Sequence, residues 1–183
     1  MTMPDRTPKY LLFLVLAVCI ALAGCSIGKK PSAPEGLQTY IDANLRFSIS
    51  YPESWADFLS TTGYGPYGPY SVDWNVQKEG LNNDISMMVI SIPLHEVVPG
   101  IKAETILLDL HPNLIITGNE AESLPAGEAS RLSGYTPDKT LQAWALDNSR
   151  RHYILVFTAP PDYFATQMTL FNSIAHSFEP HND

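Results

Sequence analysis

Two segments of this chain carry apolar side chains on both faces of an extended backbone, and this pattern constrains the fold more than any other feature. The side chains of a β-strand point alternately to opposite faces of its sheet, so a strand that is apolar on both faces must be covered on both sides. The segments are 85–92, with Met87 and Val89 opposing Met88 and Ile90, and 152–157, with Tyr153, Leu155 and Phe157 opposing Ile154 and Val156. The sequence therefore predicts a sheet buried between two layers.

A β-hairpin is predicted ahead of these segments. Residues 45–51 alternate strictly between apolar and polar side chains, which is typical of a half-buried strand. Leu37–Ile41 is the expected partner strand, because the residues 42–44 between them read Asp-Ala-Asn, and Asp and Asn tolerate tight turns. Pro52 is expected to end the second strand, and Trp55 to follow in a short turn.

The second half of the chain is predicted to form an antiparallel meander. Residues 129–135 and 141–146 are expected strands, joined by a turn at 136–138. A second turn at 147–149 leads into the 152–157 strand.

Two amphipathic segments are predicted to be helices that cover the sheet. The segment from Pro161, stopped by Pro180, places apolar residues on one face at alternating steps of four and three. The segment 102–110 also places its apolar residues on one face and is stopped by Pro112. The apolar residues are Phe164, Met168, Phe171, Ala175 and Phe178 in the first, and Ala103, Ile106, Leu107 and Leu110 in the second. The predicted fold class is α+β, an α-β-α sandwich with a mostly antiparallel sheet covered by a helix on each face.

The sequence Phe47–Trp55, which reads FSISYPESW, resembles the opening signature of the PsbP-like and Mog1-like superfamily, a strand followed by Tyr-Pro and then Trp. The terminal helix ending in Ser177 and Phe178, after an apolar strand, fits the same pattern. The superfamily includes the DUF1795 and DcrB-related bacterial lipoproteins. The resemblance implies an α-β-α sandwich and a non-enzymatic adaptor or assembly factor without a shared catalytic motif. PsbP-like proteins assist photosystem II and Mog1 binds a small GTPase, but nothing in this sequence points to either partner.

The N-terminal segment has the pattern of an export signal. Arg6 and Lys9 precede an apolar run of thirteen residues, Tyr10–Leu22. A transmembrane helix needs about 20 apolar residues, whereas the core of a signal peptide has about 7 to 15. We therefore expect residues 1–24 to be removed after export.

The end of this run, Leu22, Ala23, Gly24 and Cys25, resembles a bacterial lipobox. The resemblance implies that Cys25 becomes the first residue of the mature protein and carries a covalent diacylglycerol and an N-acyl chain, and no other cofactor is expected. If the host is Gram-negative, Ser26 after the cysteine favours, by the rule of Gram-negative family members, the outer membrane facing the periplasm. The alternative is an ordinary secretory signal, which would leave Cys25 as an exposed thiol, because Cys19 lies in the apolar run and is removed with it.

Charge and composition predict a single acidic domain on a short tether. Residues 25–36 are the acylated N-terminus and a flexible spacer rich in Gly, Lys and Pro, and 37–180 is one globular domain. The mature chain would have 9 basic and 18 acidic residues, since Arg6, Lys9 and Asp5 leave with the signal, so its net charge is 9 minus 18, or −9. With its basic residues scattered rather than clustered, it is not expected to bind nucleic acid, and its membrane contact is expected to come from the lipid.

The motifs of this sequence predict no catalytic and no metal-binding residues. His95 and Glu96 begin an HEVVP sequence, but Pro99 stands where a zinc-protease helix needs its second histidine. Asp109 and His111 are interpreted as a pair at a helix end rather than as metal ligands. No GxSxG elbow, phosphate-binding glycine loop or CxxC motif occurs. Three acidic residues flank a predicted hairpin turn at 125–127 and are interpreted as a solvated turn rather than an acid–base pair: Glu120, Glu122 and Glu128.

The stretch 63–70, which reads GYGPYGPY, is a candidate binding loop. Its tyrosines Tyr64, Tyr67 and Tyr70 recur every three residues, and a polyproline II helix has three residues per turn, so the rings could line one side. The alternative is a long loop whose tyrosines cover the edge of the core.

Three functions remain open from the sequence. The first is a non-enzymatic, membrane-anchored binding or adaptor module of the cell envelope, whose partner is an envelope protein or polymer. The second is an envelope hydrolase with a site assembled from distant residues, for which His95, His111 and His152 are the candidate bases. The third is a structural subunit of an envelope complex.

Overall fold

The computed structural model describes residues 36–60, 70–78 and 81–182. All of these residues belong to one compact unit, Ala33–Asp183. The signal segment, the lipobox with Cys25 and nearly all of the spacer lie outside the described residues, as do Tyr64 and Tyr67. No helix in the described part of the chain is both long and apolar enough to cross a membrane.

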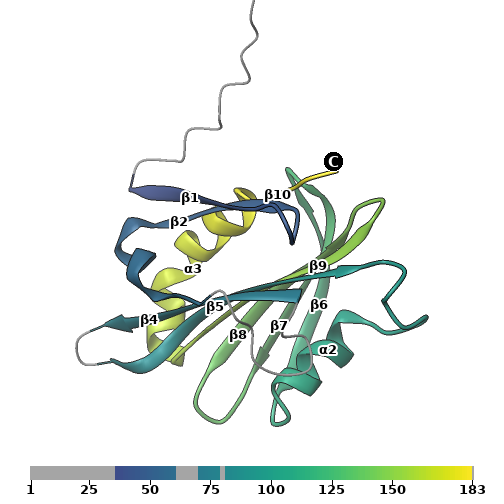
Figure 1. The fold of residues 1–183 in the computed structure, drawn as a ribbon. Coiled ribbons are helices and arrows are strands. Elements are labelled where there is room, and N and C mark those ends of the chain that lie inside the picture. Colours follow the sequence, from purple (N-terminus) through teal and green to yellow (C-terminus); the bar gives the residue numbers. More distant parts are fainter. Residues whose placement is uncertain (1–35, 61–69, 79–80, 183) are drawn as a thin grey trace, which may run out of the picture. The chain divides into compact units, whose positions relative to one another are not determined.

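The described residues form two antiparallel sheets (Figure 1). The larger sheet has the strand order β3-β4-β5-β9-β8-β7-β6, and the smaller sheet has the order β1-β2-β10. The strands of the larger sheet are β3 (Leu59–Ser60), β4 (Ser71–Lys78), β5 (Leu81–Pro93), β6 (Ile115–Leu124), β7 (Gly127–Tyr135), β8 (Thr140–Asp147) and β9 (Arg151–Ala159). Those of the smaller sheet are β1 (Leu37–Asp42), β2 (Phe47–Pro52) and β10 (Glu179–Pro180).

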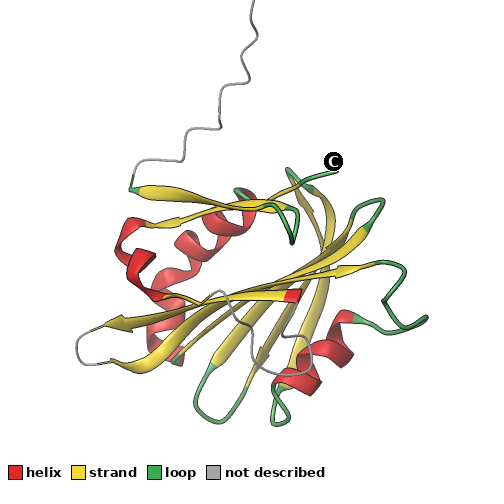
Figure 2. Cartoon of the chain, in the orientation of Figure 1, coloured by secondary structure: helices red, strands yellow, loops and turns green. Residues whose placement is uncertain are grey.

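The described residues also form three helices: the 3-10 helix η1 (Glu53–Phe58) and the α-helices α2 (Ala103–Leu110) and α3 (Pro161–His176). Helix α3 packs on β9 and β8 of the larger sheet and on β2 of the smaller sheet, and α2 covers the opposite face of the larger sheet (Figure 2). This arrangement confirms the predicted α+β sandwich with one helix on each face of an antiparallel sheet.

The strands that are apolar on both faces separate two hydrophobic cores. In β9, Tyr153, Leu155 and Phe157 point into the core beside α3, whereas Ile154 and Val156 point into the core beside α2. Strand β5 divides in the same way, since Met87 and Val89 join the first core and Ile90 and Ile92 the second. Burial on both sides is therefore the physical reason for the apolar pattern of both segments.

The predicted hairpin forms, but it belongs to the smaller sheet, and its second strand begins at Phe47 rather than at residue 45. The Asp42 Oδ1 atom accepts the backbone N–H groups of Asn44 and Leu45, both at 2.9 Å. Arg46 then adopts a left-handed backbone with a φ of 59°. These local contacts extend the turn by two residues and delay the start of β2.

The end of α3 also differs from the prediction. The helix stops at His176, and residues 179–180 pair with β2, so Pro180 lies in a strand instead of terminating the helix. Phe178 is fully buried beyond the helix end, where its ring lies 5.6 Å from that of Phe47 and 5.2 Å from that of Tyr153. The aromatic contact between these residues joins the two sheets to the end of α3.

Candidate functional site

The candidate site is an open hollow on the α2 side of the larger sheet, with a volume of about 610 Å³. Strands β6, β7, β8 and β9 form its floor, and the first turn of α2 forms one wall. We call it the histidine hollow, after His152. Its polar lining residues are Lys102, Glu104, Asn119, Glu128, Ser130, Asp147 and His152.

The register of β8 and β9 brings Asp147 and His152 together in this hollow. The two residues are directly opposite in the antiparallel pair, and Asp147 is the first residue of the predicted turn at 147–149. The Asn148 side chain fixes this turn, because its Oδ1 atom accepts the backbone N–H groups of Arg150 at 2.8 Å and Arg151 at 2.7 Å. Nδ1 of His152 then lies 2.5 Å from Oδ1 of Asp147.

A histidine held by a carboxylate has the orientation that a general base needs, but two observations limit the chemistry available here. The Nε2 atom of His152 is buried and has no hydrogen-bond partner within the described residues. Among the described lining residues, the hydroxyl on the floor of the hollow is that of Ser130 in β7. Ser130 is in register with Ile154 of β9, and strand β8 lies between them. At about 5 Å between strands, the backbone of Ser130 lies roughly 10 Å from that of Ile154 and further from that of His152, beyond hydrogen-bond reach.

The wall of the histidine hollow is held to its floor by a hydrogen bond between α2 and β6. The Asn119 side chain donates from Nδ2 to Oε1 of Glu104 at 2.7 Å. Glu104, Glu128 and Asp147 supply carboxylates, and Lys102 before α2 supplies an ammonium group. The hollow therefore offers mostly hydrogen-bond acceptors, which suits a ligand that carries hydroxyl or amino groups.

The structure does not bring the three candidate histidines into one site. His95 is exposed in the segment after β5, with Nε2 3.5 Å from Oε1 of Glu96. His111 follows α2 and lines a separate hollow of about 370 Å³. Burial, and secondly the charge of Lys139, lower the pKa of His111. The predicted position of His111 at a helix end is confirmed, since its backbone N–H donates to the carbonyl of Leu107 at 2.9 Å.

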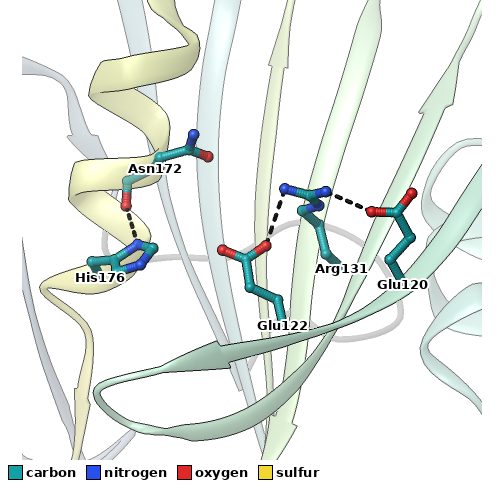
Figure 3. A network of polar contacts seen from close by, with 5 residues as sticks. All are labelled: Glu120, Glu122, Arg131, Asn172 and His176. Carbon is teal, nitrogen blue, oxygen red and sulfur yellow. Dashed lines mark hydrogen bonds and ion pairs between the residues drawn. The ribbon is translucent and has the colours of Figure 1, made fainter.

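The carboxylates of the 125–127 hairpin are divided between the two faces of the sheet. The turn forms as predicted. On the α3 side of the sheet, the guanidinium group of Arg131 lies between two of the carboxylates, 2.6 Å from Oε2 of Glu120 and 3.2 Å from Oε2 of Glu122 (Figure 3). Glu128 instead lines the histidine hollow on the α2 side. Because Glu120 and Glu122 share one arginine, they are an ion-pair cluster rather than an acid–base pair.

Two residues of α3 face this ion-pair cluster, as Figure 3 shows. His176 donates from Nδ1 to the backbone carbonyl of Asn172 at 2.8 Å, so the helix itself orients the imidazole. The Oδ1 atom of Asn172 is buried without a hydrogen-bond partner in the described part of the chain. Sequence reasoning did not find these residues, because their proximity to β6 and β7 depends on the packing of α3.

Tyr70 is the described member of the candidate tyrosine loop. Its ring packs against the core beside α2, and its hydroxyl donates to Oε2 of Glu96. This hydrogen bond raises the pKa of Tyr70. For this residue, the contacts are those of a tyrosine that covers the edge of the core.

Asp73 is a buried acid that the sequence analysis did not identify. It lies in β4 between Val72 and Trp74, and its Oδ1 atom has no hydrogen-bond partner among the described residues. Burial raises the pKa of Asp73 to about 6. The available signal was the alternation of polar and apolar residues over 71–76, which predicts a strand that contains Asp73, but β4 itself was not predicted.

Comparisons with known proteins identify the fold. No protein-family model and no curated protein match the chain. The solution structure of cyanobacterial PsbP (CyanoP) from Synechocystis matches 84% of this chain and 97% of its own, with 16% sequence identity and a TM-score of 0.59. The Ran-binding protein Mog1p from Saccharomyces cerevisiae matches 79% of this chain and 95% of its own, at 8% identity and a TM-score of 0.48.

A third solved structure in the comparison is LpqN from Mycobacterium tuberculosis, a protein involved in cell envelope biogenesis. It matches 78% of this chain and 90% of its own, at 15% identity and a TM-score of 0.45. At these identities a likeness shows the fold alone, and the match to CyanoP carries it. The chain therefore has a PsbP-like fold, as the resemblance of the sequence Phe47–Trp55 predicts.

Proposed function

We propose that this protein is an exported, lipid-anchored binding module of the cell envelope, related to the DcrB-like lipoproteins and without enzymatic activity. The observation that carries the proposal is the sequence Leu22–Cys25 at the end of the apolar run Tyr10–Leu22. A run of this length suits a signal peptide, and the cysteine at its end provides the acylation site.

Anchoring by Cys25 would make membrane association nearly permanent. One acyl chain gives marginal binding, whereas two or more give stable anchoring at about 0.8 kcal/mol per buried CH₂ group. Residues 25–36 would separate the domain from the bilayer, so that its hollows and loops remain accessible to a partner. If the host is Gram-negative, Ser26 favours the outer membrane, facing the periplasm.

The lipid anchor is tested by Cys25→Ala in the full chain, expressed in a bacterial host. The parent protein should appear in the membrane fraction, and its mass should correspond to residues 25–183 plus acyl chains. The variant should lack the acyl mass and leave the membrane fraction. Cys19→Ala is the matched control, because this cysteine lies in the removed segment and its loss should change neither result. A Cys25→Ala protein that is still cleaved and membrane-bound would contradict the proposal.

The partner of the module is proposed to meet the tyrosine loop. The hydroxyl of Tyr70 is hydrogen-bonded to Glu96, so Tyr70 has a structural contact within the domain. Two variants therefore distinguish the contribution of Tyr70 to partner binding from that of Tyr64 and Tyr67. A Tyr64→Ala/Tyr67→Ala protein should lose crosslinks to envelope components in intact cells, whereas Tyr70→Phe, which keeps the ring, should retain them. If the crosslinked partners are the same for the parent and the double variant, the loop has no binding role.

A second candidate function, an envelope hydrolase, rests on the contact between His152 and Asp147 inside the histidine hollow. The binding module is favoured because Nε2 of His152 is buried and Ser130 is out of its reach. The hydrolase predicts that the purified full chain cleaves at least one substrate in a panel of esters, peptides and glycans, and that His152→Gln abolishes this cleavage while the exposed His95→Gln does not. Without such an activity, the candidate fails.

A further inference from the structure

A second open hollow, of about 440 Å³, gathers positive charge at one end of the domain. We call it the arginine hollow, and it is lined by Arg46, Leu94, His95, Ser149, Arg150 and Arg151. The residues come from three separate places: the β1–β2 turn, the segment after β5, and the β8–β9 turn with the first residue of β9.

The charge of this hollow is opposite to that of the chain as a whole. The chain has 11 basic and 19 acidic residues and a net charge of −8. The described ranges contain seven of the basic residues, and three of these seven line the arginine hollow. The expectation that the basic residues are scattered holds along the sequence, but it is wrong in space, because the fold brings Arg46 beside Arg150 and Arg151. A local positive region on an acidic protein attracts anions selectively.

Arg151 is held in place by Ser91, a fully buried residue of β5. Its Nε atom donates to Oγ of Ser91 at 2.7 Å, and one terminal nitrogen donates to the Ser91 carbonyl at 2.8 Å. The Ser91 hydroxyl in turn donates to the carbonyl of Leu45 at 2.6 Å. A guanidinium group has five N–H donors, so these bonds fix the orientation of Arg151 while donors remain for a ligand.

Arg46 is held at the hollow by its backbone. Its φ of 59° lies in the left-handed region, which is uncommon for a residue other than glycine. The carbonyl of Arg46 accepts the hydroxyl of Tyr153 and the backbone N–H of His181, both at 2.8 Å. Backbone strain that the surrounding structure maintains in this way is concentrated at functional sites in proteins.

The acidic residue that follows His95 in the sequence is already engaged. Glu96 accepts the hydroxyl of Tyr70 and lies 3.5 Å from His95. Within the described part of the chain, none of the ion pairs involves Arg150 or Arg151. The charges of these two arginines are therefore not neutralised by a carboxylate of the described domain.

We propose that the arginine hollow binds a phosphate group. Arginine is suited to phosphate because its planar fork donates two parallel hydrogen bonds to two oxygens. Three guanidinium groups around one hollow favour the phosphate group over a single carboxylate, since phosphate offers more acceptor oxygens and, as a monoester, more negative charge. A soluble phosphate and a phospholipid head group share this chemistry. The site goes beyond the lipid anchor and does not depend on Cys25.

Equilibrium dialysis of the full chain in a non-ionic detergent tests the proposal with two probes, radiolabelled inorganic phosphate and short-chain phosphatidylglycerol. We expect saturable binding of at least one probe. Arg150→Gln should weaken it by about tenfold or more, because a charge-assisted hydrogen bond to the anion is lost. Lys102→Gln removes the same charge at the histidine hollow and should change the affinity by no more than about twofold.

The fold of each variant is controlled by thermal unfolding. Arg150 is exposed, so its replacement should not alter the unfolding temperature. Arg46→Asn is the second variant, because asparagine tolerates the left-handed backbone while removing the charge. If inorganic phosphate binds and both variants weaken this binding, the ligand is a soluble phosphate. If only phosphatidylglycerol binds and both variants weaken this binding, the ligand is a lipid head group. Equal affinities for Arg150→Gln and Lys102→Gln, or no saturable binding of either probe, would overturn the proposal.

Discussion

The hydroxyl of Tyr153, in the centre of the larger sheet, donates to the backbone carbonyl of Arg46 at a distance of 2.8 Å. Tyr153 is fully buried, and Arg46 has a left-handed backbone at the turn that begins β2. One hydrogen bond therefore connects the larger sheet to the strained turn of the smaller sheet. It also holds one side of the arginine hollow.

Tyr153→Phe should lower the free energy of unfolding by about 1 kcal/mol, because the hydrogen bond is lost while the ring and its packing remain. Urea denaturation of the full chain in detergent measures the change. Tyr135→Phe is the matched control, since Tyr135 is an exposed residue at the end of β7. Equal midpoints for the two variants would show that the Tyr153 hydroxyl does not stabilise the turn.

Gly134→Ala should lower the free energy of unfolding by about 1 to 3 kcal/mol, because the added methyl group has no space. A Cβ atom at residue 134 would lie 2.8 Å from the carbonyl oxygen of Ile115 and 2.9 Å from Cδ1 of Leu114. Gly118→Ala is a control in the paired strand, where the nearest atom, Cβ of Ser133, is 3.8 Å away. Chemical denaturation that ranks Gly118→Ala as the more damaging change would refute this close packing of β6 against β7.

Ser177→Ala should destabilise the junction between α3 and the smaller sheet by about 1 to 3 kcal/mol, because it leaves a buried backbone N–H without a partner. Oγ of Ser177 accepts the N–H of Ser50 at 2.9 Å and donates to the carbonyl of Ile174 at 2.7 Å. Ser173→Ala removes an exposed hydroxyl that bonds to its own helix and should have a smaller effect. Hydrogen exchange at the Ser50 amide provides the local readout and should accelerate only in Ser177→Ala.

Asp73→Asn should stabilise the protein at pH 7.5 and have little effect at pH 4.5. Burial raises the pKa of Asp73 from 3.8 to about 6, so the folded protein binds the proton more tightly than the unfolded chain does. Stability therefore falls as the pH rises between these two values, and the loss persists above pH 6. After allowance for solvent screening we expect a gain of about 1 to 2 kcal/mol for the variant at pH 7.5.

The control for Asp73→Asn is Glu128→Gln, which removes one negative charge from an exposed carboxyl group. Thermal unfolding is recorded for both variants and the parent at pH 4.5 and pH 7.5. If Asp73→Asn and the parent differ in stability by the same amount at both pH values, the pKa of Asp73 is not raised in the folded protein.

The periodicity of the sequence predicted the larger elements, because the apolar residues within each of them show which of its faces are buried. Strand β9 is apolar on both faces and α3 has one apolar face, and each pattern has a single structural explanation. The hairpin turn at 125–127 was predicted, but the extent of strand β6 before it was not, because β6 lies at the edge of the sheet, where most of its residues are exposed and do not alternate clearly. Strand β10 has two residues, one of them proline, and its pairing with Phe47 depends on contacts distant in the sequence.

The candidate sites required the fold for the same reason. His152 was identified from its residue type, but its partner Asp147 was assigned only to a turn, although a hairpin between these residues places them opposite each other. The arginine hollow had no sequence signal, since Arg46 is separated by about a hundred residues from Arg150 and Arg151. Charges that look dispersed in a sequence can converge when a loop near one end of a domain packs against a loop near the other.

The pairing of β2 has a consequence for the order in which this domain can form. Strand β2 has one neighbour, β1, that immediately precedes it in the chain, and another, β10, that is made only when residues 179–180 have been added. Until then the hairpin has an open edge, and Phe47 lacks the ring of Phe178. Strands β1 and β2 are therefore synthesised before most of the described domain but completed only with β10, and a ribosome that still holds residues 179–180 would keep the smaller sheet unfinished.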